Sequence, residues 1–151
     1  MNRKSCSKTM AIKSLSDDQH LARHCPKNRL VEQEGKILIL PQAFSLRPGE
    51  KYLSTTWMEH FAGTKKQRVK LITEVMRKRR SVSAKDGFAI GNVREIKGAC
   101  LEFGIKIRVN HAPKSWNAAY SSVNNYVSES QELLSLLAAE AWADLVLIKD
   151  C

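Results

Sequence analysis

The segment from Lys65 to Arg80 constrains the fold of this chain more than any other. Its apolar residues recur every three or four positions, which places them on one stripe of a helix. They are Val69, Ile72, Val75 and Met76. The other positions carry eight basic residues against one acidic residue, Glu74. The basic residues are Lys65, Lys66, Arg68, Lys70, Arg77, Lys78, Arg79 and Arg80. Since an apolar stripe packs on a core while charged groups stay in water, we expect a surface helix, capped by Thr64, with a strongly basic exposed face.

The composition is that of a folded domain. The chain has 151 residues, of which 43% are apolar, and a chain of this length buries roughly 70% of the surface that its unfolded form exposes. It holds 25 basic and 15 acidic residues, a net charge of +10, and the segment just described supplies seven of these charges. This composition excludes a wholly disordered chain and a fibrous repeat. No apolar run approaches the ~20 residues that cross a bilayer, so we expect no membrane partner.

Interspersed helix and strand signals predict an α+β fold. We expect a single compact domain over residues 16–151, in which four to five helices pack on a small, mainly antiparallel sheet. Residues 1–15 are basic and free of acidic side chains, and we expect them to form a disordered arm. The alternating run 105–109 is the clearest strand signal, and residues 88–90 predict either a short strand or a buried segment that leads into the next helix.

Capping residues and turn signals divide the rest of the chain. Ser16 as an N-cap and Pro26 as a stop predict a helix over residues 16–25. Further helices are expected over residues 55–61, over 64–80, from Asn92 to about residue 103, and from Ser128 onward. Residues 144–149 either finish that last helix or return as a strand. Residues 111–125 are expected to form a loop.

Two tight turns are predicted in the second quarter of the chain. Residues 30–46 predict a hairpin with a turn at Glu34-Gly35, a strand over residues 37–40 and a second strand over residues 43–46. Residues 47–50, with the sequence Arg-Pro-Gly-Glu, are typical of a type II turn.

The basic helix predicts a partner that is a polyanion. Clustered Lys and Arg residues bind phosphate backbones by counterion release, and we therefore expect nucleic acid or another polyanion as the partner. Lys106 and Arg108 lie on the polar face of the run 105–109 and extend the basic surface if that strand lies near the helix. Two other interpretations remain open: a helix whose charge only keeps the protein soluble, and an interaction or immunity-type module that binds an acidic protein. No base-reading motif stands out.

A small enzyme is the alternative from a different functional class. Its candidate polar site gathers residues near two loops, and the enzyme hypothesis requires that they converge in one pocket. The candidates are His24, Arg47, Glu50, Ser54, His111 and Asn117. Arg47 and Glu50 flank a Pro-Gly turn, where an ion pair that stabilises the turn is the simpler interpretation. His111 ends a predicted strand and precedes a loop that carries Trp116 and Asn117.

No cofactor or metal is expected. His20 and His24 would face the same way on a helix, a spacing that zinc sites use, but no CxxC pair supplies further ligands. No glycine-rich phosphate loop is present. Four widely spaced cysteines and the lack of a secretory apolar segment near Met1 favour a reducing, cytoplasmic location.

Several short segments together resemble a known but uncharacterised family. They are residues 20–26 (HLARHCP), residues 43–54 (AFSLRPGEKYLS), residues 57–61 (WMEHF), and residues 111–113 (HAP) with Asn117. Over the range Ser16 to Tyr120 the chain resembles small bacterial cytosolic proteins with no assigned activity. The resemblance implies a bacterial cytosolic protein and no particular reaction.

Overall fold

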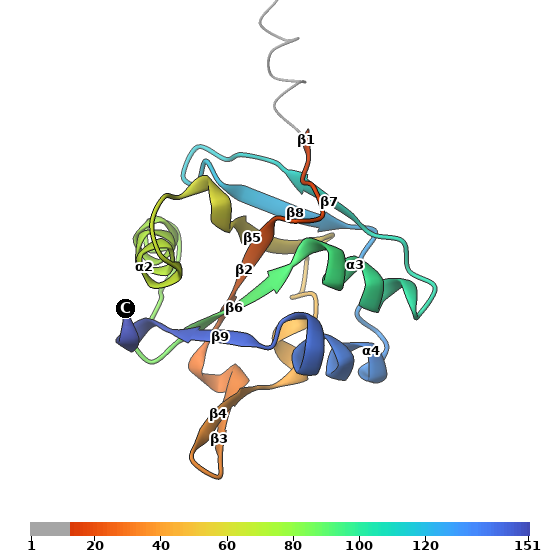
Figure 1. The fold of residues 1–151 in the computed structure, drawn as a ribbon, viewed down its shortest axis with the longest axis horizontal. Helices are drawn as coiled ribbons and strands as arrows, with labels where there is room; N and C mark the ends of the chain where they lie inside the picture. Colours follow the sequence, from red (N-terminus) through yellow and green to blue (C-terminus); the bar gives the residue numbers. More distant parts are fainter. Residues whose placement is uncertain (1–12) are drawn as a thin grey trace, which may run out of the picture.

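The computed structural model describes residues 13–151, and a seven-stranded antiparallel sheet forms its centre (Figure 1). The strand order is β1-β7-β8-β5-β2-β6-β9. The strands are β1 (Lys13–Ser14), β2 (His20–Cys25), β5 (Leu53–Trp57), β6 (Gly87–Asn92), β7 (Arg108–His111), β8 (Tyr120–Asn124) and β9 (Asp144–Leu147). A separate hairpin of β3 (Leu30–Gln33) and β4 (Lys36–Ile39) projects from the body of the molecule.

Helices cover both faces of this sheet. The α-helices of the described residues are α2 (Lys65–Met76), α3 (Val93–Leu101) and α4 (Gln131–Leu136), and α4 continues as a π-helical turn, Leu137–Ala141. Short 3₁₀ turns occur at Lys27–Arg29, Pro41–Phe44, Met58–His60 and Ile148–Asp150. Figure 1 places α2 on one side of the sheet and α3 with α4 on the other. No helix of residues 13–151 is long and apolar enough to cross a bilayer.

Two buried clusters lie on opposite faces of the sheet, because successive strand residues point to opposite faces. On β2, Leu21 belongs to the cluster with α3 and α4, whereas Ala22 belongs to the cluster under α2. On β6, Ala89 belongs to the cluster with α3 and α4, whereas Phe88 belongs to the cluster under α2. The larger cluster includes Trp142, which is fully buried. The sheet therefore separates the main core from the smaller core that anchors α2.

The expected fold, a small sheet with four to five helices, is wrong. The structure is a sheet-rich α+β fold with three α-helices among the described residues. The largest error concerns residues 16–25, which were expected to form a helix. Residues His20–Cys25 instead form β2, which pairs with β5 on one side and with β6 on the other. Local capping signals favoured the helix, but pairing on both sides of the strand outweighs them.

Other predicted elements changed their type or position. Residues 55–61 continue a strand and end in a 3₁₀ turn, in keeping with the β-branched Thr55 and Thr56. The expected strand at 105–109 begins only at Arg108. The expected loop 111–125 contains β8, a central strand that includes two buried serines, and small polar residues give little strand signal. Residues 41–44 form a 3₁₀ turn where a strand was expected from residue 43.

Predictions that rest on local chemistry are confirmed. Thr64 and Gln67 form a reciprocal capping box at the start of α2. Glu34 and Gly35 have φ angles of 53° and 79°, which suits the tight turn between β3 and β4. Of the two structures expected for residues 144–149, the end of a helix or a returning strand, the strand is confirmed, because Asp144–Leu147 form β9.

The last residues of the expected arm belong to the folded part of the chain. Lys13 pairs with His111 as β1 joins the edge of β7, and Leu15 is buried. The rest of the expected arm, residues 1–12, lies outside the described residues.

Candidate functional site

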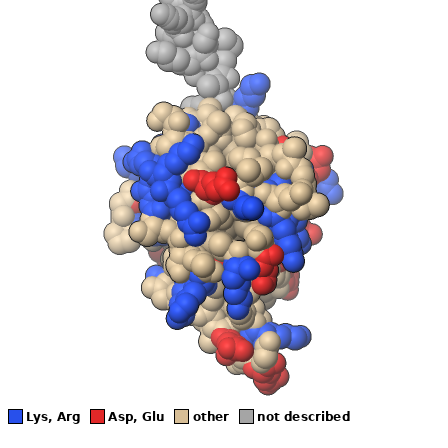
Figure 2. All heavy atoms as spheres, turned by 90° about the vertical axis from the view of Figure 1, so that its left-hand side faces the viewer, with Lys and Arg blue, Asp and Glu red and all other residues tan. Residues whose placement is uncertain are grey.

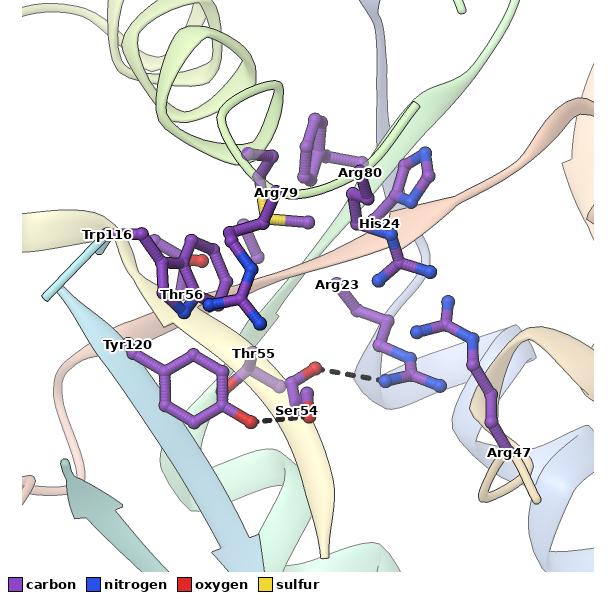
Figure 3. A pocket seen from close by; sticks show the side chains of 13 residues that line it. Arg23, His24, Arg47, Ser54, Thr55, Thr56, Arg79, Arg80, Trp116 and Tyr120 are labelled. Carbon is purple, nitrogen blue, oxygen red and sulfur yellow. Dashed lines mark hydrogen bonds between the residues drawn. The ribbon is translucent and has the colours of Figure 1, made fainter. Parts of the chain in front are cut away.

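A pocket of about 320 Å³ opens where β2 and β5 separate (Figure 3). The two strands pair only at Leu21 with Trp57 and at Ala22 with Thr56, whereas β2 pairs with β6 along its whole length. The gap lies beside the turn that follows α2. The lining residues are Ala22, Arg23, His24, Arg47, Ser54, Thr55, Thr56, Met76, Arg79, Arg80, Phe88, Trp116 and Tyr120.

Arg23 fills the gap between the two strands. Only 1% of this residue is exposed. Its guanidinium donates to the backbone carbonyls of Ala43, Ser45 and Ser54 at 3.1, 3.2 and 3.0 Å. Glu50 Oε2 lies 3.7 Å from Arg23 Nη1. Burial lowers the pKa of Arg23 from its ordinary value, and the charge of Glu50 opposes that shift. The three hydrogen bonds therefore hold the guanidinium group in place, and the carboxylate of Glu50 offsets only part of its positive charge.

Arg47 is presented by the predicted tight turn. The Glu50 N–H donates to the Arg47 carbonyl at 2.9 Å, and the Arg47 N–H donates to Glu50 Oε1 at 2.6 Å. Gly49 has a φ of 87°, as a type II turn requires. Glu50 therefore stabilises the turn through the backbone of Arg47 and not through its side chain. Burial, with the nearby charges of Arg23 and Arg80, lowers the pKa of Arg47 to about 10.

Arg79 and Arg80 reach the pocket from the turn after α2. Their N–H groups both donate to the Met76 carbonyl at 3.0 Å, which ends the helix and turns the chain over the pocket. Arg79 Cζ lies 5.4 Å from the centre of the Trp116 ring, a cation–π contact. Figure 3 shows the guanidinium groups of Arg23, Arg47 and Arg80 turned toward one shared space, whereas the guanidinium group of Arg79 lies beside Trp116. Among the described residues, no carboxylate forms an ion pair with Arg47, Arg79 or Arg80.

His24 forms a buried pair with Asp86. His24 Nε2 and Asp86 Oδ2 are 2.9 Å apart, and Asp86 also accepts from the N–H groups of Lys27 and Ser83. Burial lowers the pKa of His24 more than the hydrogen bond to Asp86 raises it, and the charge of Arg80 adds to the decrease. His24 is therefore neutral at pH 7, with Nε2 as the donor to Asp86. Its Nδ1 is buried and has no hydrogen-bond partner among the described residues.

Aromatic and hydroxyl groups form the opposite wall. The hydroxyl oxygens of Tyr120 and Ser54 are 2.6 Å apart, and the Tyr120 ring meets the Trp116 ring edge-on at 5.8 Å. Asn117 lies behind this wall, where its side chain donates to Thr56 Oγ1 at 3.1 Å and accepts from the Ala119 N–H at 2.9 Å. Asn117 thus holds the loop that carries Trp116.

The structure brings together half of the candidate enzyme residues. His24, Arg47 and Ser54 line the pocket. Glu50 contacts Arg23, and Asn117 supports the wall from behind. His111 is not part of the lining, because its Nε2 bonds to the Ala118 carbonyl at 2.7 Å and its ring packs on Trp57.

The basic candidates separate into groups. Lys66, Lys70 and Lys78 are exposed on or just after α2, while Lys65 pairs with Asp144 at 2.7 Å. Figure 2 shows groups of Lys and Arg side chains over the face on which α2 lies, with few acidic groups between them.

The remaining basic candidates contribute less to this face. Arg77 Nε donates to the Val82 carbonyl at 3.0 Å, and Arg68 is half-buried. The segment that joins α3 to β7 holds Lys106 and leads to Arg108, and it lies across the molecule from α2 (Figure 1). These two residues therefore do not extend the basic surface.

The metal spacing considered for His20 and His24 depended on a helix that does not form. On a strand these residues lie about 13 Å apart, and His20 pairs with Glu59 at 2.6 Å. No group of three potential ligands gathers within residues 13–151.

Sequence reasoning missed Arg23, Tyr120 and Asp86. Arg23 lies between the apolar residues Leu21 and Cys25 on one face of a strand, and this position indicates that its side chain is buried. A buried arginine requires several hydrogen-bond acceptors, so this position marks a residue that connects parts of the fold. No local signal marked Tyr120 or Asp86.

Comparison of the chain with protein-family models, with curated protein sequences and with solved structures finds no match. The chemistry of the pocket therefore rests on its own residues. Guanidinium groups bind oxyanions through paired N–H donors, and phosphate is a preferred ligand of this kind. The neighbouring aromatic rings provide surfaces on which a planar group can stack.

Proposed function

We propose that this protein binds nucleic acid through a basic surface made of the exposed face of α2, the turn 77–80 and the mouth of the pocket. The observation that carries the proposal is that four arginines line one pocket at the end of a basic helix. Three of them have no ion-pair partner among the described residues. A phosphate backbone supplies the missing negative charge.

The dimensions of the surface support a nucleic-acid strand as the ligand. Helix α2 has 12 residues and is therefore about 18 Å long, a distance over which one strand of a duplex presents about five phosphates. The exposed Lys66 and Lys70 lie one turn apart on it. Trp116, a half-buried residue beside the arginines, adds a stacking surface, which favours unpaired bases. An acidic protein would use the charge of this surface but not the aromatic wall.

The test is a binding titration of the full chain with labelled single-stranded RNA, single-stranded DNA and duplex DNA. We expect micromolar or tighter binding to a single strand at about 50 mM salt, which weakens steeply toward about 200 mM. Absence of binding to all three at the lower salt contradicts the proposal. Binding to an acidic protein without affinity for nucleic acid would instead support the interaction module.

Two double variants distinguish binding that depends on this particular surface from binding that depends only on the net charge of the protein. Arg79→Gln with Arg80→Gln removes two charges from the pocket, while Lys106→Gln with Arg108→Gln removes two charges from the other side of the molecule. We expect the first pair to weaken binding by about tenfold or more and to reduce the salt dependence by about two ions. The second pair should change affinity less than about threefold. Equal losses in both would show that only net charge matters.

A further inference from the structure

The pocket holds more positive charge than its neighbouring carboxylates offset. Four arginines line it, and two carboxylates contact lining residues: Glu50 contacts Arg23, and Asp86 bonds to His24. With His24 neutral, two positive charges remain uncompensated. A phosphomonoester carries a charge of about −1.5 to −2 at pH 7, whereas each phosphate within a strand carries one negative charge. The charge of the pocket therefore matches a phosphomonoester.

The arrangement of the guanidinium groups favours the same ligand. Arg23 is fixed by three backbone carbonyls, and Arg47 and Arg80 approach the shared space from other elements (Figure 3). A phosphomonoester has three free oxygen atoms that accept hydrogen bonds, whereas a phosphate inside a strand has only two. Three guanidinium groups around one point can each bind one oxygen of a terminal phosphate.

The size and walls of the pocket favour one nucleotide. Its volume of about 320 Å³ lies at the lower end of the range for small-ligand sites, roughly 300–1,000 Å³. Trp116, with Arg79 over its ring, lies beside the arginine cluster. Tyr120 continues this wall and carries a hydroxyl group next to Ser54. These groups suit a planar base and a sugar hydroxyl attached to the phosphate.

We propose that the pocket binds a nucleotide phosphomonoester, with its phosphate among Arg23, Arg47 and Arg80 and its base on the side of Trp116 and Arg79. This inference rests on the proposed function and names the part of the nucleic acid that enters the pocket. Two sources present the same chemistry, namely the phosphorylated end of a strand and a free mononucleotide.

The test compares strands of one sequence that differ only at one end. One pair carries a phosphate or a hydroxyl group at the 5′ end, and a second pair differs in the same way at the 3′ end. We expect the phosphorylated member of at least one pair to bind about tenfold more tightly, because the pocket gains a charge-assisted contact. A nucleoside monophosphate should compete with it, and the corresponding nucleoside should not. Competition without an end preference would assign the pocket to the free mononucleotide.

Matched variants assign the preference to the pocket. Arg47→Gln should bring the affinity ratio of phosphorylated to hydroxyl ends close to one, because it weakens binding of the phosphorylated strand more than binding of the hydroxyl strand. Lys70→Gln removes one charge from the exposed face of α2 and should weaken both strands alike, so that their ratio is kept. Arg80→Gln, at an exposed residue, should lower the same ratio and also weaken both strands, and it serves as the second variant if Arg47→Gln disturbs folding, which circular dichroism reports.

The two proposals fail in different ways. If hydroxyl strands bind through the α2 lysines but neither end preference nor competition by a mononucleotide is found, the inference about the pocket is wrong and the proposed function remains. If no strand binds but the nucleoside monophosphate does, the pocket is assigned correctly and the proposed function is wrong.

Discussion

At the scale of single residues, Arg23 connects three separate parts of the chain. It lies on β2 and donates to Ala43 and Ser45 in one connecting segment and to Ser54 on β5. The pairing of β2 and β5 stops just before it. Its side chain thus replaces the missing backbone bonds of a sheet whose strands have separated, and the same separation creates the pocket.

Replacement of Arg23 by Met should lower the free energy of unfolding by about 3 kcal/mol or more, because three backbone carbonyls lose their hydrogen-bond donor and Glu50 loses its ion-pair partner. Arg23→Lys should not restore stability, since one ammonium group cannot reach three carbonyls that lie in different directions. Urea unfolding measures both effects. Arg47→Gln is the control and should stay within about 1 kcal/mol of the original protein. A similar small change in Arg23→Met would contradict this role of the guanidinium.

His24 should make stability depend on pH near neutrality. Its folded-state pKa is lowered by burial below the ordinary 6.5, so the unfolded chain binds more protons as the pH falls through and below 6.5. The free energy of unfolding should therefore decrease as the pH falls from about 7 toward about 5. Unfolding measured across this range should show a shallower slope in His24→Gln. An unchanged slope in His24→Gln would contradict the assignment.

At the scale of elements, the turn 137–141 packs closely on β6. The absence of a side chain at Gly91 permits this contact, because an added Cβ would lie 2.8 Å from two atoms of the Trp142 ring and 3.0 Å from the Ala141 carbonyl. Gly98 on α3 has no atom within 4 Å of the same position and is exposed. The same substitution should therefore have opposite effects at these two glycines.

Gly91→Ala should destabilise the protein by about 1–3 kcal/mol through overpacking. Gly98→Ala should stabilise it by about 0.5–1 kcal/mol, since alanine loses less conformational entropy than glycine in a helix. Thermal or urea unfolding of the two variants measures both the expected decrease and the expected increase in the free energy of unfolding. An unchanged free energy of unfolding in Gly91→Ala would contradict this prediction, since it would mean that Trp142 moves aside without an energetic cost.

At the scale of the whole molecule, the net charge of +10 is unevenly distributed. Lys66 and Lys70 are like charges one helical turn apart, a spacing that destabilises a helix by a few tenths of a kcal/mol. The arginines around the pocket add to this repulsion. This concentration of positive charge therefore lowers the stability of the protein at low salt.

Raising the concentration of sodium chloride from about 20 to about 200 mM should increase the free energy of unfolding by on the order of 1 kcal/mol. The double variant Lys66→Gln with Lys70→Gln should gain less from salt than the original protein, because part of the repulsion is gone. Lys106→Gln with Arg108→Gln removes the same charge from elsewhere and should gain nearly as much as the original. Equal behaviour of the two variants would show that the charges act only through their total.

Residues close together in the chain are enough to specify the elements that depend on near neighbours. The capping box of α2, the turn at Glu34-Gly35 and the turn that presents Arg47 all follow from residues within about four positions of one another. The amphipathic pattern also determined that α2 has a buried stripe and a basic exposed face.

The strand β2 and the pocket, in contrast, depend on contacts between distant parts of the chain. The type of β2 depends on backbone bonds to β5 and β6, which are distant in the sequence. The pocket joins Arg23, Arg47, Arg80 and Tyr120, whose meeting depends on the order of the strands and on the point where two of them separate. No local pattern encodes that point, because it results from the packing of the whole sheet.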